Sequence, residues 1–281
     1  MRLGIDIGGT YLRYELRQEQ QTIEKASLKS SEVDLIDFIE ETLLREPSLK
    51  SIYIAFAGQV QNGKIIAAPH IILKNKSIKT YIESRYDVML YIENDLSCAV
   101  LAESQYYKSE NIVALYVGTG LGMGVISDGR LLRGSSNIAA EIGHIPYKET
   151  PFICSCTKSN CLELIASGSG LLRYKEQMHL EKNLTLQMLR ESKDLESQRL
   201  YNEFVEGLLH AIGIAITLCN PEVLVLGGGI IADDLEIYEV ILRRIKSYAM
   251  PLSLQTVKIV RSQLEDAALR GAFLLKDTYV K

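Results

Sequence analysis

Short apolar runs alternate with amphipathic stretches along the whole chain, and this alternation restricts the fold more than any other feature. Apolar residues recur with helical spacing at 33–44, 95–107 and 198–219, and the last pattern stops at Asn220-Pro221, as a helix does before proline. Strands buried on both faces of a parallel sheet form such continuous apolar runs, so the sequence predicts an α/β fold with a largely parallel sheet. The predicted strands are Leu3–Ile7, Ser51–Phe56, Val88–Ile92, Val113–Val117 and Val223–Leu226.

The bulk composition is that of an ordinary globular protein, with 281 residues that are 47% hydrophobic and 23% charged. A formal net charge of -4 gives no reason to expect a nucleic-acid partner. The longest apolar stretch, at 211–219, is shorter than a membrane span, and the first residues enter a strand without a signal-peptide layout. We therefore expect a cytoplasmic protein with no membrane partner.

Two glycine-rich turns each follow an apolar strand and precede another strand, and both predict phosphate binding. Glycines there present N–H groups to phosphate oxygens without a Cβ in the way. Asp6 can hold the waters of a magnesium ion, and Arg13 can reach a phosphoryl oxygen. The two hairpins fit either two related lobes or two unrelated turns. The turn residues are Gly8, Gly9 and Thr10 in the first and Gly118, Thr119, Gly120 and Gly122 in the second.

The commoner nucleotide motifs are missing from the sequence. No G-x-x-x-x-G-K-[ST] occurs, and the run from Gly118 does not complete G-x-G-x-x-G, because Met123 stands at its last position. A third glycine cluster follows the strand at 223–226, where Gly227 and Gly228 would let an adenine ring lie against the backbone. These glycines also fit a plain strand-to-helix turn, and the two interpretations are compatible with each other.

Asp95 follows a predicted strand and begins a predicted helix, in the run Ile92-Glu93-Asn94-Asp95. One interpretation is structural, since an aspartate there is an ordinary N-cap. The other is a general base that takes the proton of a sugar hydroxyl during phosphoryl transfer. The helix N-terminus should keep this carboxylate ionised at neutral pH. In the second interpretation, Asn94 hydrogen-bonds another sugar hydroxyl.

A histidine and three crowded cysteines predict a metal site. His144, Cys154, Cys156 and Cys161 match a closed Cys₃His zinc set, whereas the alternative is a group of buried free thiols. Four protein ligands leave no open position, so the zinc would be structural. It would fix Glu141 and Glu163, whose carboxylates suit sugar hydroxyls, and His144 could bind metal through one ring nitrogen and a sugar through the other.

Taken in order, these motifs resemble the ROK family of sugar kinases and repressors over nearly the whole chain. The resemblance implies a two-lobed, actin-like or hexokinase-type ATPase fold with ribonuclease H-like lobes and a cleft between them. We expect a smaller lobe at 1–111 and a larger lobe with the zinc loop at 112–281, the last helix being able to pack back on the first lobe. The matching stretches are 6–10, 57–60, 93–95, 118–122, 141–144, the cysteine cluster, Asn220-Pro221, 227–229 and 270–272.

The resemblance also implies ligands and partners: ATP, Mg²⁺, structural Zn²⁺ and a homodimer. It implies a sugar held by Gly58, Asn94, Asp95, Glu141, His144 and Glu163. We expect phosphorylation of a glucose-like hexose at its 6-hydroxyl. The alternatives are an N-acetylmannosamine or N-acetylglucosamine kinase and a non-catalytic sugar sensor, and a repressor is disfavoured because no DNA-binding segment precedes Asp6.

The chain departs from the family pattern in the zinc loop, where the family usually has glycines at the positions of Thr157 and Asn160. Asparagine tolerates a left-handed backbone, but a β-branched threonine fits such a turn poorly. We therefore expect a zinc loop that is bent differently, with all four ligand types retained.

Overall fold

The computed structural model describes residues 1–68, 71 and 73–276, which form two compact units. The first unit contains Met1–Lys108, Arg130–Ala139 and the described residues from 264 on. The second contains Ser109–Gly129 and Ala140–Gln263. Each unit has its own sheet and its own hydrophobic core.

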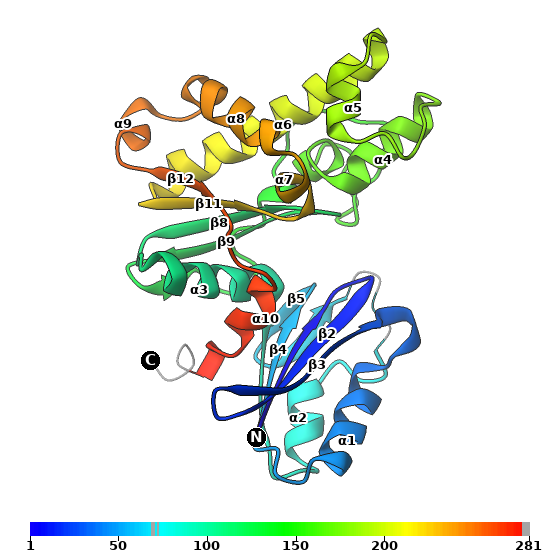
Figure 1. Cartoon of the computed structure of the whole chain (residues 1–281), viewed down its shortest axis with the longest axis vertical. Coiled ribbons are helices and arrows are strands. Elements are labelled where there is room, and N and C mark those ends of the chain that lie inside the picture. The colour runs from blue at the N-terminus through cyan, green and yellow to red at the C-terminus, as the bar shows by residue number, and fades with distance from the viewer. Residues whose placement is uncertain (69–70, 72, 277–281) are drawn as a thin grey trace. The chain divides into compact units, whose positions relative to one another are not determined.

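The first unit is built on a five-stranded sheet of order β3-β2-β1-β4-β7 (Figure 1). The β1–β2 and β2–β3 pairs are antiparallel, and β1–β4 and β4–β7 are parallel. A small β5–β6 hairpin completes its strands. The strands are β1 (Arg2–Ile7), β2 (Tyr11–Gln18), β3 (Gln21–Lys29), β4 (Ser51–Phe56), β5 (Gln59–Gln61), β6 (Lys64–Ala67) and β7 (Met89–Asn94).

The described part of the first unit contains two longer helices, α1 and α3, and three short ones. Helix α1 begins after Asp34, whose carboxylate accepts hydrogen bonds from two helix N–H groups, so the predicted helix at 33–44 is confirmed with shifted ends. Helix α10 packs on α3 around buried side chains such as Tyr53, Tyr91 and Phe273. The helices are η1 (Ser30–Glu32), α1 (Leu35–Arg45), α2 (Ile78–Glu83), α3 (Asp95–Tyr107) and α10 (Ala267–Ala272).

The second unit repeats the topology of the first, with sheet order β10-β9-β8-β11-β12. A glycine-turned hairpin, β8–β9, again lies beside parallel strands, since β8–β11 and β11–β12 are parallel. The strands expected in a largely parallel sheet lie in two mixed sheets, one in each unit, and the repeated order favours two related lobes. The strands of this sheet are β8 (Ile112–Val117), β9 (Leu121–Ser127), β10 (Arg130–Leu131), β11 (Val223–Gly227) and β12 (Lys258–Arg261), of which β10 clusters with the first unit.

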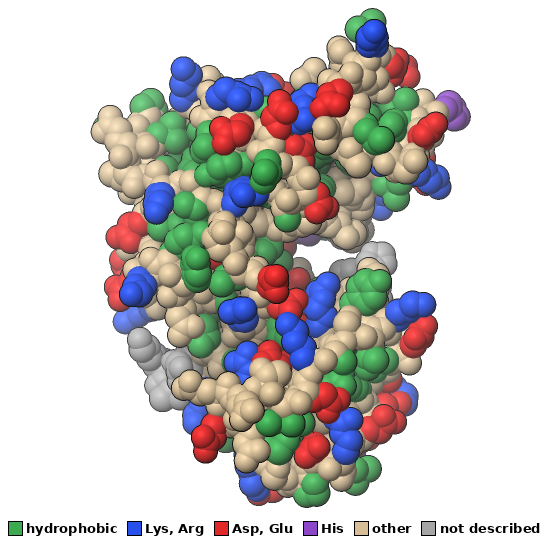
Figure 2. Space-filling model, viewed as in Figure 1, with side chains coloured by type: hydrophobic (Ala, Val, Ile, Leu, Met, Phe, Trp, Pro, Cys, Tyr) green, Lys and Arg blue, Asp and Glu red, His purple; other side chains and the backbone are tan. Residues whose placement is uncertain are grey.

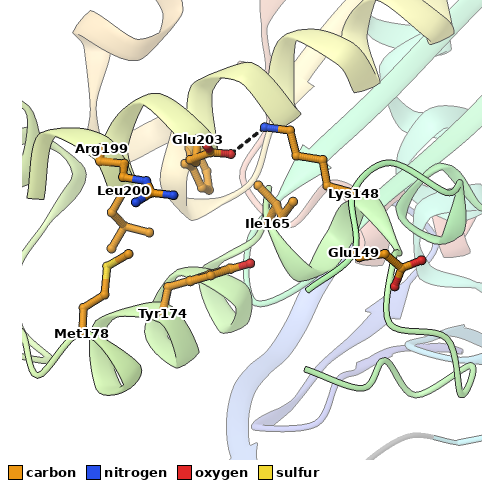
Figure 3. A pocket seen from close by; sticks show the side chains of 9 residues that line it. Lys148, Glu149, Ile165, Tyr174, Met178, Arg199, Leu200 and Glu203 are labelled. Carbon is orange, nitrogen blue, oxygen red and sulfur yellow. Dashed lines mark hydrogen bonds and ion pairs between the residues drawn. The ribbon is translucent and has the colours of Figure 1, made fainter. Parts of the chain in front are cut away.

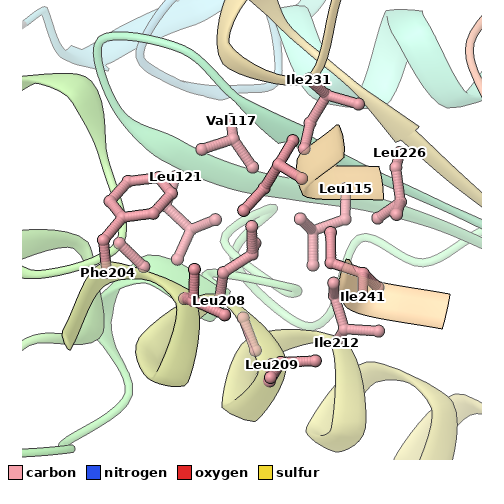
Figure 4. Close-up of a cluster of buried hydrophobic side chains, with 14 of the residues drawn as sticks. Leu115, Val117, Leu121, Phe204, Leu208, Leu209, Ile212, Leu226, Ile231 and Ile241 are labelled. Carbon is pink, nitrogen blue, oxygen red and sulfur yellow. The ribbon is translucent and has the colours of Figure 1, made fainter. Parts of the chain in front are cut away.

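Helix α6 forms the centre of the second core, where its apolar side chains pack on those of β8, β9 and β11 (Figure 4). It begins after Asp194, which accepts a hydrogen bond from the Ser197 N–H, three residues before the predicted start at 198. It ends at Cys219, with Asn220 as a left-handed C-cap, so the predicted stop before Pro221 is confirmed. The helices are η2 (Ile142–His144), η3 (Leu162–Leu164), α4 (Gly168–Gln177), α5 (Leu186–Glu191), α6 (Leu195–Cys219), α7 (Gly229–Asp233), α8 (Leu235–Arg244), η4 (Ile245–Ser247) and α9 (Pro251–Leu254).

Helix α6 is also the one described helix whose length and composition would suit a membrane span. Of its most apolar window, 56% is buried inside the protein. Its hydrophobicity is therefore accounted for by the core of the second unit.

Charges of both signs are interspersed over the face drawn in Figure 2. This distribution agrees with the small net charge of -4. No extended field of one sign is visible on that face.

Candidate functional site

The first glycine turn joins β1 to β2 and is fixed from both sides. The Gly8 N–H donates to the Tyr11 carbonyl at 2.9 Å, and the Ser30 hydroxyl donates to the Gly8 carbonyl at 2.7 Å. The Ser30 N–H donates to the Thr10 carbonyl at 3.0 Å. Gly9 and Thr10 are exposed at the tip. The turn is thus a preformed backbone loop open to a ligand.

Asp6 lies at the base of this turn, mostly buried, with its carboxylate 3.3 Å from the Arg13 guanidinium. Burial raises the pKa of Asp6 to about 6, while Arg13 lowers it and the nearby Asp266 raises it. Asp266 also lies 3.9 Å from Arg13 and 2.8 Å from the Lys25 ammonium. Asp266 was not predicted from the sequence, because it follows no phosphate motif and comes from the far end of the chain.

The start of α3 separates the two interpretations of Asp95. Asn94 is the N-cap, and its side-chain oxygen accepts from the Leu96 N–H at 2.9 Å and the Ser97 N–H at 3.1 Å. Asp95 is the first helical residue, and its Oδ1 accepts from the Leu96 N–H and from Asn94 Nδ2, at 2.9 and 3.0 Å. The ordinary capping role therefore belongs to Asn94, and the helix does not need Asp95 for it.

Asn94 also ties Asp95 to the turn at Gly58, because its Nδ2 donates to the Gly58 carbonyl at 3.2 Å. Both N–H groups and both lone pairs of the Asn94 amide are thus used within the protein. A side chain at Gly58 would have no room, since its Cβ would lie 2.4 Å from the Ala67 carbonyl and 2.7 Å from the Phe56 ring. The structure brings Gly58, Asn94 and Asp95 together in the first unit.

The second glycine turn joins β8 to β9 and is held by the start of α4. The N–H groups of Gly168 and Ser169 donate to the carbonyls of Gly118 and Thr119, at 2.8 and 3.0 Å. Gly122 lies within β9, paired with Tyr116, so it belongs to the strand rather than to the turn itself.

Glu163 lies against this turn, where its Oε2 accepts from the Leu121 N–H at 3.0 Å. A Cβ at Gly120 would come 2.7 Å from the same oxygen. The close approach of the carboxylate therefore requires the glycine, and it links the predicted sugar and phosphate residues of the second unit.

Glu141, His144 and Glu163 are gathered at one place. His144 Nε2 lies 3.9 Å from a Glu141 carboxylate oxygen. Burial raises the pKa of Glu141, an effect that His144 opposes and Glu163 reinforces. A cluster of two carboxylates and an imidazole can accept and donate several hydrogen bonds at once, as a polyhydroxyl ligand requires.

The four predicted metal ligands also come together, with donor atoms all within 4.8 Å of one another. His144 Nδ1 lies 3.4 Å from Cys154 Sγ, and the Sγ atoms of Cys156 and Cys161 are 3.2 Å apart. None of these cysteines forms a disulfide. Three thiols and one imidazole nitrogen converging on a point fit a closed tetrahedral zinc site.

The metal loop keeps a tight turn despite its threonine. Thr157 has φ +75°, in the left-handed region, and its N–H donates to the Cys154 carbonyl at 2.9 Å. Asn160, in contrast, does not have a positive φ. At Thr157 the backbone thus has the conformation that glycine favours, and the β-branched side chain is strained there by about 1–2 kcal/mol.

The third glycine cluster is explained by packing against β8. A Cβ at Gly227 would lie 2.7 Å from the Tyr116 ring, and one at Gly228 would lie 2.3 Å from the Val117 carbonyl. Gly228 also has φ +89°, which side chains rarely adopt. The strand-to-helix turn between β11 and α7 therefore requires both glycines, whatever binds there.

A pocket of about 210 Å³ lies elsewhere in the second unit, between α4 and α6 (Figure 3). The Lys148–Glu203 ion pair borders it, at 2.7 Å, and Tyr174 and Met178 form one wall. None of the residues predicted from the motifs lines it. The lining is Lys148, Glu149, Ile165, Tyr174, Met178, Arg199, Leu200, Glu203 and Phe204.

Comparison with known proteins gives a consistent family match. The ROK family model matches residues 2–278. The glucokinase of Thermotoga maritima is 27% identical, over 96% of this chain and 95% of that protein. An N-acetylglucosamine repressor of Escherichia coli O6:H1 is 28% identical, over 91% of this chain and 66% of that protein. The relatives therefore include both a sugar kinase and a repressor.

The fold is also that of solved ROK structures. A ROK family glucokinase from Streptomyces griseus, crystallised with glucose and AMPPNP, superposes with a TM-score of 0.78. The match covers 98% of this chain and 99% of that chain, at 22% identity. The expected hexokinase-type, actin-like ATPase fold is confirmed.

Proposed function

Because the chain belongs to the ROK family, we propose that it transfers the γ-phosphoryl group of ATP to the 6-hydroxyl of a glucose-like hexose. The observation that carries the proposal is at the start of α3. There Asn94 caps the helix, and Asp95 stands beside it with its carboxylate oriented by the Asn94 amide. A carboxylate at this position, not needed as the cap, suits a general base.

Asp95 would accept the proton of the sugar hydroxyl as its oxygen attacks the γ-phosphorus and ADP leaves. Phosphoryl transfer needs mainly positioning and neutralised charge besides such a base. Asp6 would hold the waters of Mg²⁺, which supplies charge neutralisation on the phosphates. The turns at 8–10 and 118–120 would offer N–H groups, with Arg13 as a cationic partner, and Gly227 and Gly228 would border the adenine.

Glu141, His144 and Glu163 would bind the sugar hydroxyls, together with Gly58. His144 has the geometry for two roles, since Nδ1 faces Cys154 and Nε2 faces Glu141. Zinc on His144 and the three cysteines would hold that imidazole in place. The Asn94 amide already uses its N–H groups and lone pairs within the protein, so we assign it to orienting Asp95, and a sugar hydroxyl would bind Asn94 only by replacing one of these hydrogen bonds.

We also propose a homodimeric assembly, which the family resemblance implies, and a cytoplasmic location, which the sequence analysis predicts. Size-exclusion chromatography with light scattering would measure the assembly directly.

Two alternatives concern the ligand and the chemistry. An N-acetylated hexosamine, N-acetylmannosamine or N-acetylglucosamine, is the second candidate substrate, and the N-acetylglucosamine repressor among the relatives favours testing it. A sugar sensor without catalysis is the other. The presence of Asp6, Asp95 and both phosphate turns in the chain favours the enzyme over the sensor.

The test is ADP release from ATP over a panel of hexoses and N-acetylhexosamines, with wild type and Asp95→Asn compared. We expect one sugar to be turned over and kcat to fall by about 10²–10⁴-fold in Asp95→Asn, which keeps shape and loses the base. Asp34→Asn is the matched control, since Asp34 caps α1 and has no proposed role in binding or catalysis, and its kcat should be unchanged. Sugar binding without any ADP release would instead establish the sensor.

A further inference from the structure

Glu93 is a fully buried carboxylate for which the proposed reaction has no direct use. It is the residue before the Asn94–Asp95 pair, near the end of β7. A buried charge is unfavourable unless it is paired and hydrogen-bonded. Its partners therefore show what this position does.

Three N–H donors surround the Glu93 carboxylate. Oε1 accepts from the Asn94 backbone N–H at 3.0 Å and from Asn137 Nδ2 at 2.6 Å. Oε2 accepts from Arg133 Nε at 2.9 Å, which makes a buried ion pair. Both carboxylate oxygens are thus engaged, one with a cation.

Two of these donors come from a segment distant in sequence, Arg130–Ala139. This segment clusters with the first unit, although the residues before and after it belong to the second. It is a tight loop, since the Ala139 N–H donates to the Arg133 carbonyl at 3.2 Å, and Gly134 and Asn137 have φ of +67° and +61°. The hydrogen bonds of Arg133 and Asn137 to Glu93 tie this loop to the first unit.

Asn137 extends the network to the Gly58 turn. Its Nδ2 also donates to the Val60 carbonyl at 2.7 Å, in β5 immediately after that turn. Asn94 reaches the same turn through Gly58. Glu93 is therefore the common anchor of three segments: the Gly58–Val60 turn, the Asn94–Asp95 helix start, and the loop whose chain continues to Glu141.

We propose that Glu93 is a positioning residue for the phosphoryl transfer, acting through Asn94 on Asp95 and through Arg133 and Asn137 on the 130–139 loop. This inference rests on the proposed kinase function. A displacement of a catalytic group by about 1 Å can cost 10²-fold in rate. The Glu93 network is what fixes the backbone on which that group stands.

The test compares Glu93→Gln with Glu15→Gln. Both are buried glutamates of the same sheet paired with an arginine, but Glu15 pairs with Arg17 on β2, away from Asp95. Glutamine keeps the shape and removes the charge that holds Arg133. We expect kcat to fall by 30-fold or more in Glu93→Gln, with KM for ATP within twofold, and kcat to stay within twofold in Glu15→Gln.

A second readout does not depend on activity. Hydrogen exchange of the backbone amides at 130–139 should be at least tenfold faster in Glu93→Gln than in wild type and unchanged in Glu15→Gln. A folded Glu93→Gln with wild-type kcat and wild-type exchange would overturn the proposal. Wild type without turnover of any sugar would overturn the kinase function instead, while the exchange result would still decide whether Glu93 holds the loop.

Discussion

Single residues in this protein carry conflicting demands of stability and function, and Asp6 is the clearest case. It is mostly buried beside a turn whose proposed ligand is a phosphate with Mg²⁺. Its charged form is unfavourable there, as its pKa of about 6 shows. We infer that the charge is retained for the ligand at the expense of the fold.

Replacing Asp6 by asparagine should therefore stabilise the protein at neutral pH while abolishing Mg²⁺-dependent turnover. The pKa is raised from 3.8 to about 6, so protonation of Asp6 stabilises the native state as pH falls from 6 towards 4. The gain in Asp6→Asn, roughly 1–3 kcal/mol at pH 7.5, should then disappear over that window. Urea unfolding of both proteins at pH 7.5, 6 and 4.5 measures it.

The control for this prediction is Asp87→Asn, an exposed aspartate whose change should leave the free energy of unfolding nearly unaltered. An Asp6→Asn protein that is less stable than wild type at pH 7.5 would contradict the prediction. It would mean that the Arg13 ion pair outweighs the burial of Asp6.

At the scale of elements, the sequence predicted most strands and the long helices, because their apolar periodicity is local. It also predicted the candidate site residues of each turn, because a glycine-rich motif is likewise local in the sequence. It missed the roles of Glu93 and Asp266, whose partners lie far away in the chain, and the mixed, partly antiparallel pairing within each sheet. Such pairings depend on tertiary contacts that no local pattern encodes.

The close contact between α10 and α3 gives a prediction at the scale of elements. A Cβ at Gly271 would lie 1.7 Å from the Cys98 carbonyl oxygen, so the helices touch at the backbone. Gly271→Ala should push α10 away from α3 and lower the free energy of unfolding by about 3 kcal/mol or more. Chemical denaturation measures the loss.

Gly229→Ala is the matched control, because this helical glycine in α7 has its nearest neighbour at 3.9 Å from the added Cβ. It should be neutral or stabilising by up to about 1 kcal/mol. If Gly271→Ala lowers the free energy of unfolding no more than Gly229→Ala does, the prediction is wrong. Helix α10 would then be able to move away from α3 at little cost.

For the whole molecule, the metal site predicts that purified protein carries about one zinc per chain, measured by elemental analysis. A strong chelator should lower the Tm and speed hydrogen exchange at 144–161 more than in β1, because all four ligands belong to the second unit. Cys161→Ser should lose the zinc, and Cys219→Ser, outside the cluster, should retain it. Protein that is metal-free as purified, with its four ligands unmodified, would contradict the prediction.

The two units are interleaved along the chain, since the path changes from one to the other after residues 108, 129, 139 and 263. The core around Tyr53 and Tyr91 is completed by Leu269 and Phe273, near the end of the described chain. A ribosome making this protein must therefore reach residue 273 before this smaller core can close, whereas the main core of the first unit needs only the first 92 residues. The core of the second unit includes Ala249, so it closes after the main core of the first unit has been synthesised.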